Sequence, residues 1–112
     1  MSDDCLFCSI VAGDVPADVV AENDHALAFR DINPQAPTHA LVIPRTHQPD
    51  VGSLAEADPE AAVAVLRLAR QVADEAGGSY RLVFNTGADA HQTVFHCHGH
   101  VLAGRSLDWP PG

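Results

Sequence analysis

Basic residues are scarce in this sequence of 112 residues. Lysine and arginine together number six against fifteen aspartates and glutamates, which gives a formal net charge of −9. A chain this acidic repels an extended phosphate backbone, so the charge argues against nucleic-acid binding as its main task. A single phosphate group on a small ligand stays within reach, because backbone N–H groups and histidine rings can hold it locally.

Long apolar runs, targeting signals and repeats are also missing. No apolar run approaches the roughly 20 residues that a membrane span requires. The acidic N-terminus, Met1-Ser2-Asp3-Asp4, lacks the basic region of a signal peptide. No repeat, low-complexity stretch or linker divides the chain, and its length suits one hydrophobic core. We therefore expect a cytoplasmic protein with one domain over residues 1–112 and no membrane partner.

Cysteine is rare as well. The three cysteines are an odd number that fits poorly with a disulfide framework. Cys5 and Cys8 have the two-residue gap of a zinc knuckle, although the gap alone is weak evidence. A thioredoxin-like redox pair needs a preceding strand, and four residues leave no room for one. Two buried free thiols remain the alternative to a metal site.

The hydrophobic pattern indicates a mostly antiparallel α+β domain. The clearest element is a long helix, with Asp58 as N-cap, Pro59 in its first turn and Gly77-Gly78 after its end. Between them, apolar residues recur at helical spacing. The other expected elements are a short helix over residues 5–12 and strands over residues 19–21, 26–29, 39–43, 80–84 and 93–102.

Three of the seven histidines alternate at positions 96, 98 and 100. In a strand, alternate residues face the same side, so the three rings are expected to share one face. A merely solvated polar face is disfavoured by the apolar residues on both sides of the run. One metal held by all three is disfavoured too, since a rise of about 3.3 Å per residue separates His96 from His100 by roughly 13 Å.

Adjacent imidazoles suit chemistry at phosphorus. A neutral imidazole near pH 7 is a good nucleophile, and the N–P bond that it forms is labile enough for water to break. Neighbouring rings can donate hydrogen bonds to the phosphoryl oxygens, where negative charge accumulates. The run therefore predicts a nucleophile with two supporting groups.

The segment from His96 to Leu102 resembles the signature of the histidine triad (HIT) nucleotide-binding proteins, in which three histidines alternate with other residues. Further matches, which bring the resemblance to residues 5–112, are Leu27 to His39, Leu41-Val42-Ile43-Pro44, Gly104-Arg105 and Trp109-Pro110-Pro111-Gly112. The chain is most similar to the Hint branch, the purine nucleoside phosphoramidases. The resemblance implies a HIT-like fold: an antiparallel sheet of about five strands with one long and one or two short helices. It also implies a homodimer in which two sheets form a larger continuous one.

The resemblance assigns roles to the histidines. It makes His98 the nucleophile that carries a nucleotidyl group, and it places His100 on the α-phosphate. His96 lies beside His98, and His39 supports the triad from the neighbouring strand. The implied reaction is hydrolysis of purine nucleoside 5′-phosphoramidates, such as AMP joined to an amine through a P–N bond. Two alternatives stay open: a HIT branch that cleaves dinucleoside polyphosphates or transfers nucleotides, and a non-catalytic AMP sensor.

The resemblance also implies nucleotide contacts. Asp31 accepts hydrogen bonds from the ribose hydroxyls, with Phe29 and Ile32 lining the base pocket. The contacts near the phosphate and leaving group are Asn85, His91, Gln92 and Thr93. From the residues alone, a turn-forming role is favoured for Asp31, and Asn85 has the same alternative. Three positions depart from the family pattern. Gly99 replaces an apolar residue, which should weaken the local strand. Cys97 is small and apolar enough to serve as packing, and His91 replaces glycine.

Bacterial relatives with a similar cysteine pair close a structural zinc site with two histidines, and those positions match His47 and His96. The implied set of Cys5, Cys8, His47 and His96 would stabilise the fold and take no part in chemistry. No catalytic metal is required. The tail containing Trp109 is expected to cross a dimer interface toward the partner's active site, and removing residues 105–112 should shift the preference for the leaving group.

Overall fold

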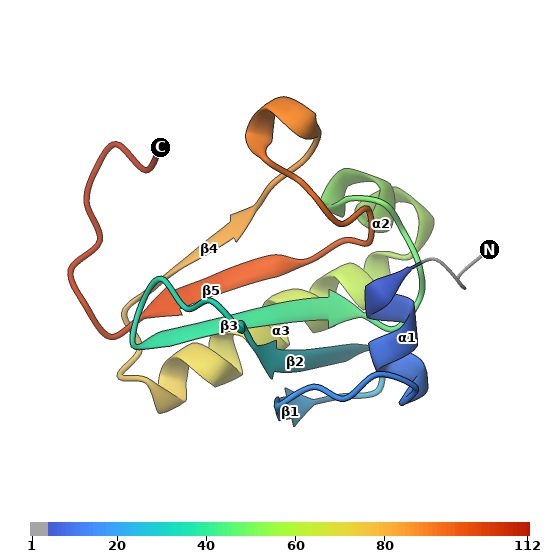
Figure 1. Cartoon of the computed structure of the whole chain (residues 1–112), viewed down its shortest axis with the longest axis horizontal. Coiled ribbons are helices and arrows are strands. Elements are labelled where there is room, and N and C mark those ends of the chain that lie inside the picture. The colour runs from blue at the N-terminus through green and yellow to red at the C-terminus, as the bar shows by residue number, and fades with distance from the viewer. Residues whose placement is uncertain (1–4) are drawn as a thin grey trace.

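The computed structural model describes residues 5–112, which form a five-stranded antiparallel sheet with three α-helices (Figure 1). In chain order the strands are β1 (Val19–Glu22), β2 (Ala26–Arg30), β3 (Thr38–Pro44), β4 (Tyr80–Phe84) and β5 (Gly99–Ala103). Their order across the sheet is β1-β2-β3-β5-β4, so the last strand pairs between the third and the fourth. The predicted α+β fold class, with about five strands and one long helix, is confirmed.

The long helix α3 (Pro59–Glu75) covers one face of the sheet (Figure 1). It begins as the sequence predicts, because an Asp58 carboxylate oxygen accepts a hydrogen bond from the Ala61 N–H at 3.2 Å and Pro59 needs no N–H partner. Its apolar stripe packs against small side chains of the strands, which are Ala26, Ala28, Ala40, Val42 and Val101. Over residues 5–112, none of the helices combines the length and apolar character needed to cross a bilayer.

The short helix α1 (Leu6–Ala12) lies on the opposite face, near one end of β2 and β3. Cys5 is its N-cap, and Gly13 ends it in the left-handed conformation with a φ of 83°. Phe7 from this helix packs in a second apolar cluster with Leu27, Phe29, Leu41 and Ile43. Because α3 and α1 cover its two sides, β3 is buried along nearly its whole length.

The strand predicted over residues 93–102 is wrong in its first half, since β5 begins only at Gly99. The preceding segment bonds to the loop before α2 (Val51–Ala57), a short helix that the sequence analysis did not predict. The Cys97 N–H donates to the Gln48 carbonyl at 2.7 Å, and the Gln92 amide donates to the Pro49 carbonyl at 2.6 Å. His96, Cys97 and His98 therefore lie outside the regular strand, so the three histidines are not carried by one continuous β-strand.

Gly99, one departure within the histidine run, has a packing cause. A Cβ atom built at this position would lie 2.8 Å from two ring atoms of Phe84 and 2.9 Å from a methyl carbon of Leu82. Gly99 pairs directly with Phe84 across β4 and β5, so the phenylalanine ring occupies the space that a larger residue would need. The absence of a side chain at residue 99 is thus matched by a large side chain on the neighbouring strand.

Candidate active site and metal site

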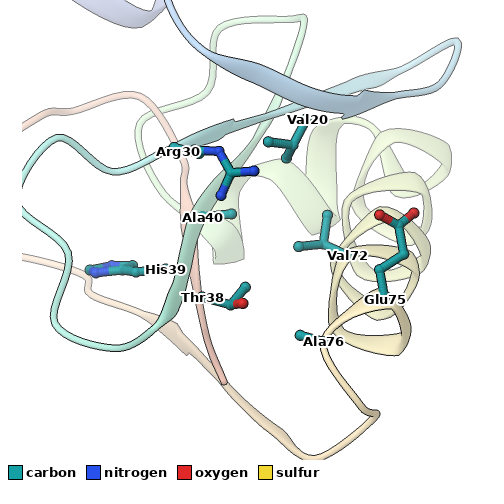
Figure 2. Close-up of a pocket in the computed structure, with 8 residues that line it drawn as sticks. All are labelled: Val20, Arg30, Thr38, His39, Ala40, Val72, Glu75 and Ala76. Atoms are coloured by element: carbon teal, nitrogen blue, oxygen red, sulfur yellow. The ribbon is translucent and has the colours of Figure 1, made fainter. Parts of the chain in front are cut away.

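Three histidine rings gather on the sheet face opposite to α3. The pairing of β3 with β5 sets His100 opposite Leu41, two residue pairs away from the pair that His39 forms with Leu102, so that the side chains of His39 and His100 face the same side of the sheet. The ring centroids of His39 and His100 are 5.2 Å apart, and those of His98 and His100 are also 5.2 Å apart. A cavity of about 170 Å³ borders β3 as well, but Figure 2 shows that Thr38 and Ala40 point into it while the His39 ring points away.

The backbone fixes the tautomer of a neutral His98 ring. Its Nδ1 lies 2.8 Å from the carbonyl oxygen of His96. A carbonyl accepts only, so Nδ1 must carry the proton and donate. In a neutral imidazole the lone pair is then on Nε2. In the neutral ring, Nε2 of His98 is thus the nitrogen with the free lone pair, and the nucleophilic role predicted for this residue stays a prediction.

His100 presents the opposite kind of group. The Gln35 backbone N–H donates to Nδ1 of His39 at 3.0 Å, so in a neutral ring the His39 proton is on Nε2. That Nε2 lies 3.0 Å from Nδ1 of His100, which therefore accepts and leaves the His100 proton on its own Nε2. His98 thus offers a lone pair, and its neighbour His100 offers an N–H donor.

Burial keeps the rings of His39 and His100 neutral. Desolvation lowers the pKa of His39, although the nearby Asp31 charge opposes the shift. Desolvation, together with His98 and His39, lowers the pKa of His100 to about 4. Both rings are therefore uncharged near pH 7. In that state the Gln35 N–H donates to His39, and His39 in turn donates to His100.

Asp31, in the loop after β2, lies beside His39 and His100. One carboxylate oxygen accepts the Asn33 N–H at 2.8 Å, and the other lies 3.4 Å from Nε2 of His39. Asp31, His39 and His100 are close enough together to hold a metal ion. The Gln35 N–H speaks against one, because it keeps the proton of a neutral His39 on the nitrogen that would have to bind the metal. The geometry favours a hydrogen-bonded chain.

The ring of His96 faces a different set of residues. Its Nε2 donates to the Pro44 carbonyl at 2.9 Å, which leaves the lone pair on Nδ1. This Nδ1 lies 3.4 Å from the sulfur atoms of both Cys5 and Cys8, and the Cys8 sulfur lies 3.2 Å from Nδ1 of His47. Cys5, Cys8, His47 and His96 thus lie close enough to hold a metal ion. What His96 contributes to the active site is its carbonyl, which orients His98.

The residues expected to contact a nucleotide differ in how far they are exposed to solvent. Phe29 is buried in the apolar cluster beneath α1, whereas Ile32 is fully exposed beside Asp31. Asn85 is half-buried just after β4, and Thr93 is exposed. These four assignments stay predictions that a nucleotide complex would test.

Gln92 and His91 have local roles in the loop between β4 and β5. The Gln92 side chain is buried, and its amide bonds the backbone of Gly87, Pro49 and Val94, so it fixes the loop. His91 is exposed and follows the short 3-10 helix η2 (Ala88–Ala90). Its φ of 65° lies in the left-handed region, where glycine fits without strain. This conformation explains why a glycine suits the position in relatives. The nucleotide contacts predicted for both residues stay predictions.

Three positions that sequence reasoning missed shape this site. The Phe7 ring contacts the rings of both His96 and His98. Its sequence signal was its place between Cys5 and Cys8, which puts it beside any site that they form. Gln35 and Pro44 act through their backbone groups, which leave no signal in the side-chain sequence.

Comparison with known proteins agrees with this geometry. The model of the HIT domain family matches residues 12–107. Over the full length of both chains, the sequence is 43% identical to a HIT-like protein of Synechocystis sp. and 48% identical to one of Synechococcus elongatus. The crystal structure of a HIT family hydrolase from Legionella pneumophila superposes with a TM-score of 0.91 at 46% identity, covering 97% of this chain and all of that one. The chain therefore belongs to the HIT domain family.

Proposed function

We propose that this protein is a hydrolase of purine nucleoside 5′-phosphoramidates, of the Hint branch, and that His98 is its nucleophile. The observation that carries the proposal is the hydrogen bond from Nδ1 of His98 to the His96 carbonyl, which leaves Nε2 unprotonated. A free neutral imidazole exchanges between its two tautomers. Here the fold has already chosen the tautomer that attacks phosphorus.

The reaction proceeds in two displacements. Nε2 of His98 attacks the α-phosphorus, the P–N bond breaks, and the amine leaves as it takes up a proton. Water then attacks the phosphorus of nucleotidyl-His98, which releases the nucleoside monophosphate and restores the ring. In both steps the Nε2–H of His100 donates to a phosphoryl oxygen, where charge builds up.

The ligand's other groups are met by the residues that the family resemblance suggested. Asp31 accepts hydrogen bonds from the ribose hydroxyls, and Phe29 and Ile32 face the purine. The set toward the phosphate and the leaving amine is Asn85, His91, Gln92 and Thr93. The short distance between Asp31 and His39 supports a ribose site close to the triad.

A structural zinc ion completes the proposal, held by Cys5, Cys8, His47 and His96. Ligand atoms around a tetrahedral zinc lie about 3.5 Å apart, and the N···S distances of 3.2 to 3.4 Å among these four residues are close to that value. The Pro44 carbonyl supports His96 as a ligand, since a hydrogen bond to the other ring nitrogen is usual for metal-bound histidine. Metal analysis of protein purified without chelator should give about one zinc per chain, and a ratio near zero would reject the site.

We propose a homodimer as the working form. β4 is an edge strand of the sheet, and Val63, Leu66 and Tyr80 are large apolar side chains exposed on α3 and β4. Trp109 is 81% exposed, with the Arg81 guanidinium 5.9 Å from its ring centre. A partner could cover these groups, and light scattering should give twice the chain mass.

The decisive experiment is mass spectrometry after a brief mix with adenosine 5′-phosphoramidate. We expect an added AMP group on His98 in the wild type and none in His98→Ala. Turnover that survives His98→Ala would end the proposal. Binding of AMP with no turnover in the wild type would favour a sensor, and turnover of dinucleoside polyphosphates alone would favour the other HIT branch.

A further inference from the structure

The Phe7 ring lies against the histidine run. Its centroid is 5.1 Å from that of His98 at an interplanar angle of 83°, and 5.9 Å from that of His96 at 76°. Both are edge-to-face contacts, the arrangement that the charge distribution of aromatic rings favours. One side chain of α1 thus touches the candidate nucleophile and the residue whose carbonyl orients it.

Phe7 is held firmly in this place. It is only 5% exposed and packs among Leu27, Phe29, Leu41 and Ile43. A second edge-to-face contact joins it to Phe29 at 5.6 Å. The ring cannot turn away from His98 without opening the apolar cluster, so it acts as a fixed wall beside the imidazole.

We propose that Phe7 is a positioning residue for His98, fixing the tilt of its imidazole and thereby the direction of Nε2. The hydrogen bond from Nδ1 to the His96 carbonyl anchors one atom of the ring, and a ring anchored at one atom can still rock or flip. The Phe7 wall removes that freedom. The inference rests on the proposed role of His98 as nucleophile, because a nucleophile must be held in line with the bond that breaks.

The kinetic test compares Phe7→Leu with Leu27→Ala. Leu27 belongs to the same cluster, but it lies on β2, and β3 separates that strand from β5. We expect Phe7→Leu to lower kcat on adenosine 5′-phosphoramidate about tenfold with KM within twofold. Leu27→Ala should leave kcat within twofold, and Phe7→Tyr, which keeps the ring, should recover most of the loss.

A spectroscopic test does not depend on catalysis. In protein labelled with ¹⁵N-histidine, the nitrogen shifts of His98 report which ring nitrogen carries the proton. We expect the Nδ1–H form alone in the wild type and in Leu27→Ala, and a mixture of the two tautomers in Phe7→Leu. If the wild type does not turn over phosphoramidates, the proposed function fails, and the nitrogen shifts still decide the role of Phe7.

Several results would overturn the inference. One is a pure Nδ1–H form in Phe7→Leu with kcat unchanged. A rise in KM with unchanged kcat would make Phe7 a ligand contact instead, and an equal loss of kcat in Leu27→Ala would reduce its role to general stability. If Phe7→Leu does not fold, Phe7→Met removes the ring with less change in volume, and the same outcomes apply to it.

Discussion

His96 and His100 are the same residue type in the same short run, yet their rings belong to two different groups. The first group is Cys5, Cys8, His47 and His96, in which a ring nitrogen faces two sulfur atoms. The second is Asp31, His39, His98 and His100, in which rings bond to one another and to the backbone. In both groups a backbone group chooses the tautomer: the Pro44 carbonyl for His96, and the Gln35 N–H, through His39, for His100. In a neutral ring, the hydrogen-bond partner of one nitrogen determines whether the other nitrogen carries a proton or a lone pair.

The largest expected effect separates the two groups directly. His98→Ala should reduce turnover of adenosine 5′-phosphoramidate by about 10³-fold or more, because no other group replaces the nucleophile. His96→Ala should instead abolish metal binding and lower stability by about 3 kcal/mol, since it removes a ligand and opens a buried cavity. Single-turnover kinetics and urea unfolding of both variants check this. Equal losses of stability in the two would contradict the division.

Metal removal tests the first group alone. Dialysis against a strong chelator should lower Tm by about 10 °C or more, because metal binding to the folded chain contributes to its stability. Calorimetry before and after adding back zinc measures the effect. A chelated sample with the original Tm would show that Cys5 and Cys8 are half-buried free thiols that hold no metal. Cys97, whose thiol pKa burial raises to about 12, should be unaffected by the treatment.

Acid should act on the second group. The pKa of His100 is about 4 in the folded protein and 6.5 in an unperturbed chain, so the unfolded state binds its proton more tightly. Its contribution to stability is complete above pH 6.5 and is lost as pH falls toward 4, by at most about 3 kcal/mol. Urea unfolding across this range should show a shallower acid decline in His100→Asn than in the wild type. Parallel curves would disprove the contribution.

The smallest expected effect lies at the boundary between His98 and His100. Gly99→Leu should destabilise the protein by about 2 kcal/mol, because its Cβ would collide with the Phe84 ring. Adding Phe84→Val should restore most of that loss by making room. Thermal unfolding of the single and double variants measures both steps. A double variant no better than the single one would assign the cost to the contact with the Leu82 methyl carbon instead.

Local patterns predicted most of the secondary structure. Asp58, Pro59 and the following apolar spacing predicted α3 almost to the residue, because a cap and a periodic stripe act within one helix. The start of β5 was not predictable in this way. The sequence analysis predicted a strand over residues 93–98, but the Cys97 N–H donates to the Gln48 carbonyl, which is distant in sequence and belongs to a loop. A strand needs a partner along its length, and local alternation does not show where the partner ends.

In the candidate site too, some residues were predictable from the sequence and others were not. The resemblance carried by residues 96–102 named His98, His100 and the metal set of Cys5, Cys8, His47 and His96, and the structure brings each group together. Sequence reasoning missed Phe7 as a neighbour of His98, because the contact joins residues at opposite ends of the chain. It also missed the Gln35 N–H, a backbone group that every residue except proline has.

By itself, the sequence determined which chemical groups are present and how they are spaced: an acidic chain, a cysteine pair, three alternating histidines and a capped helix. Only the tertiary structure decided which nitrogen of each neutral ring carries the proton: the Pro44 carbonyl selects it for His96, the His96 carbonyl for His98, and the Gln35 N–H, through His39, for His100. The physical reason is that an imidazole has two nitrogens with interchangeable protons. Hydrogen bonds from distant parts of the chain select between them, and no spacing along the sequence encodes that choice.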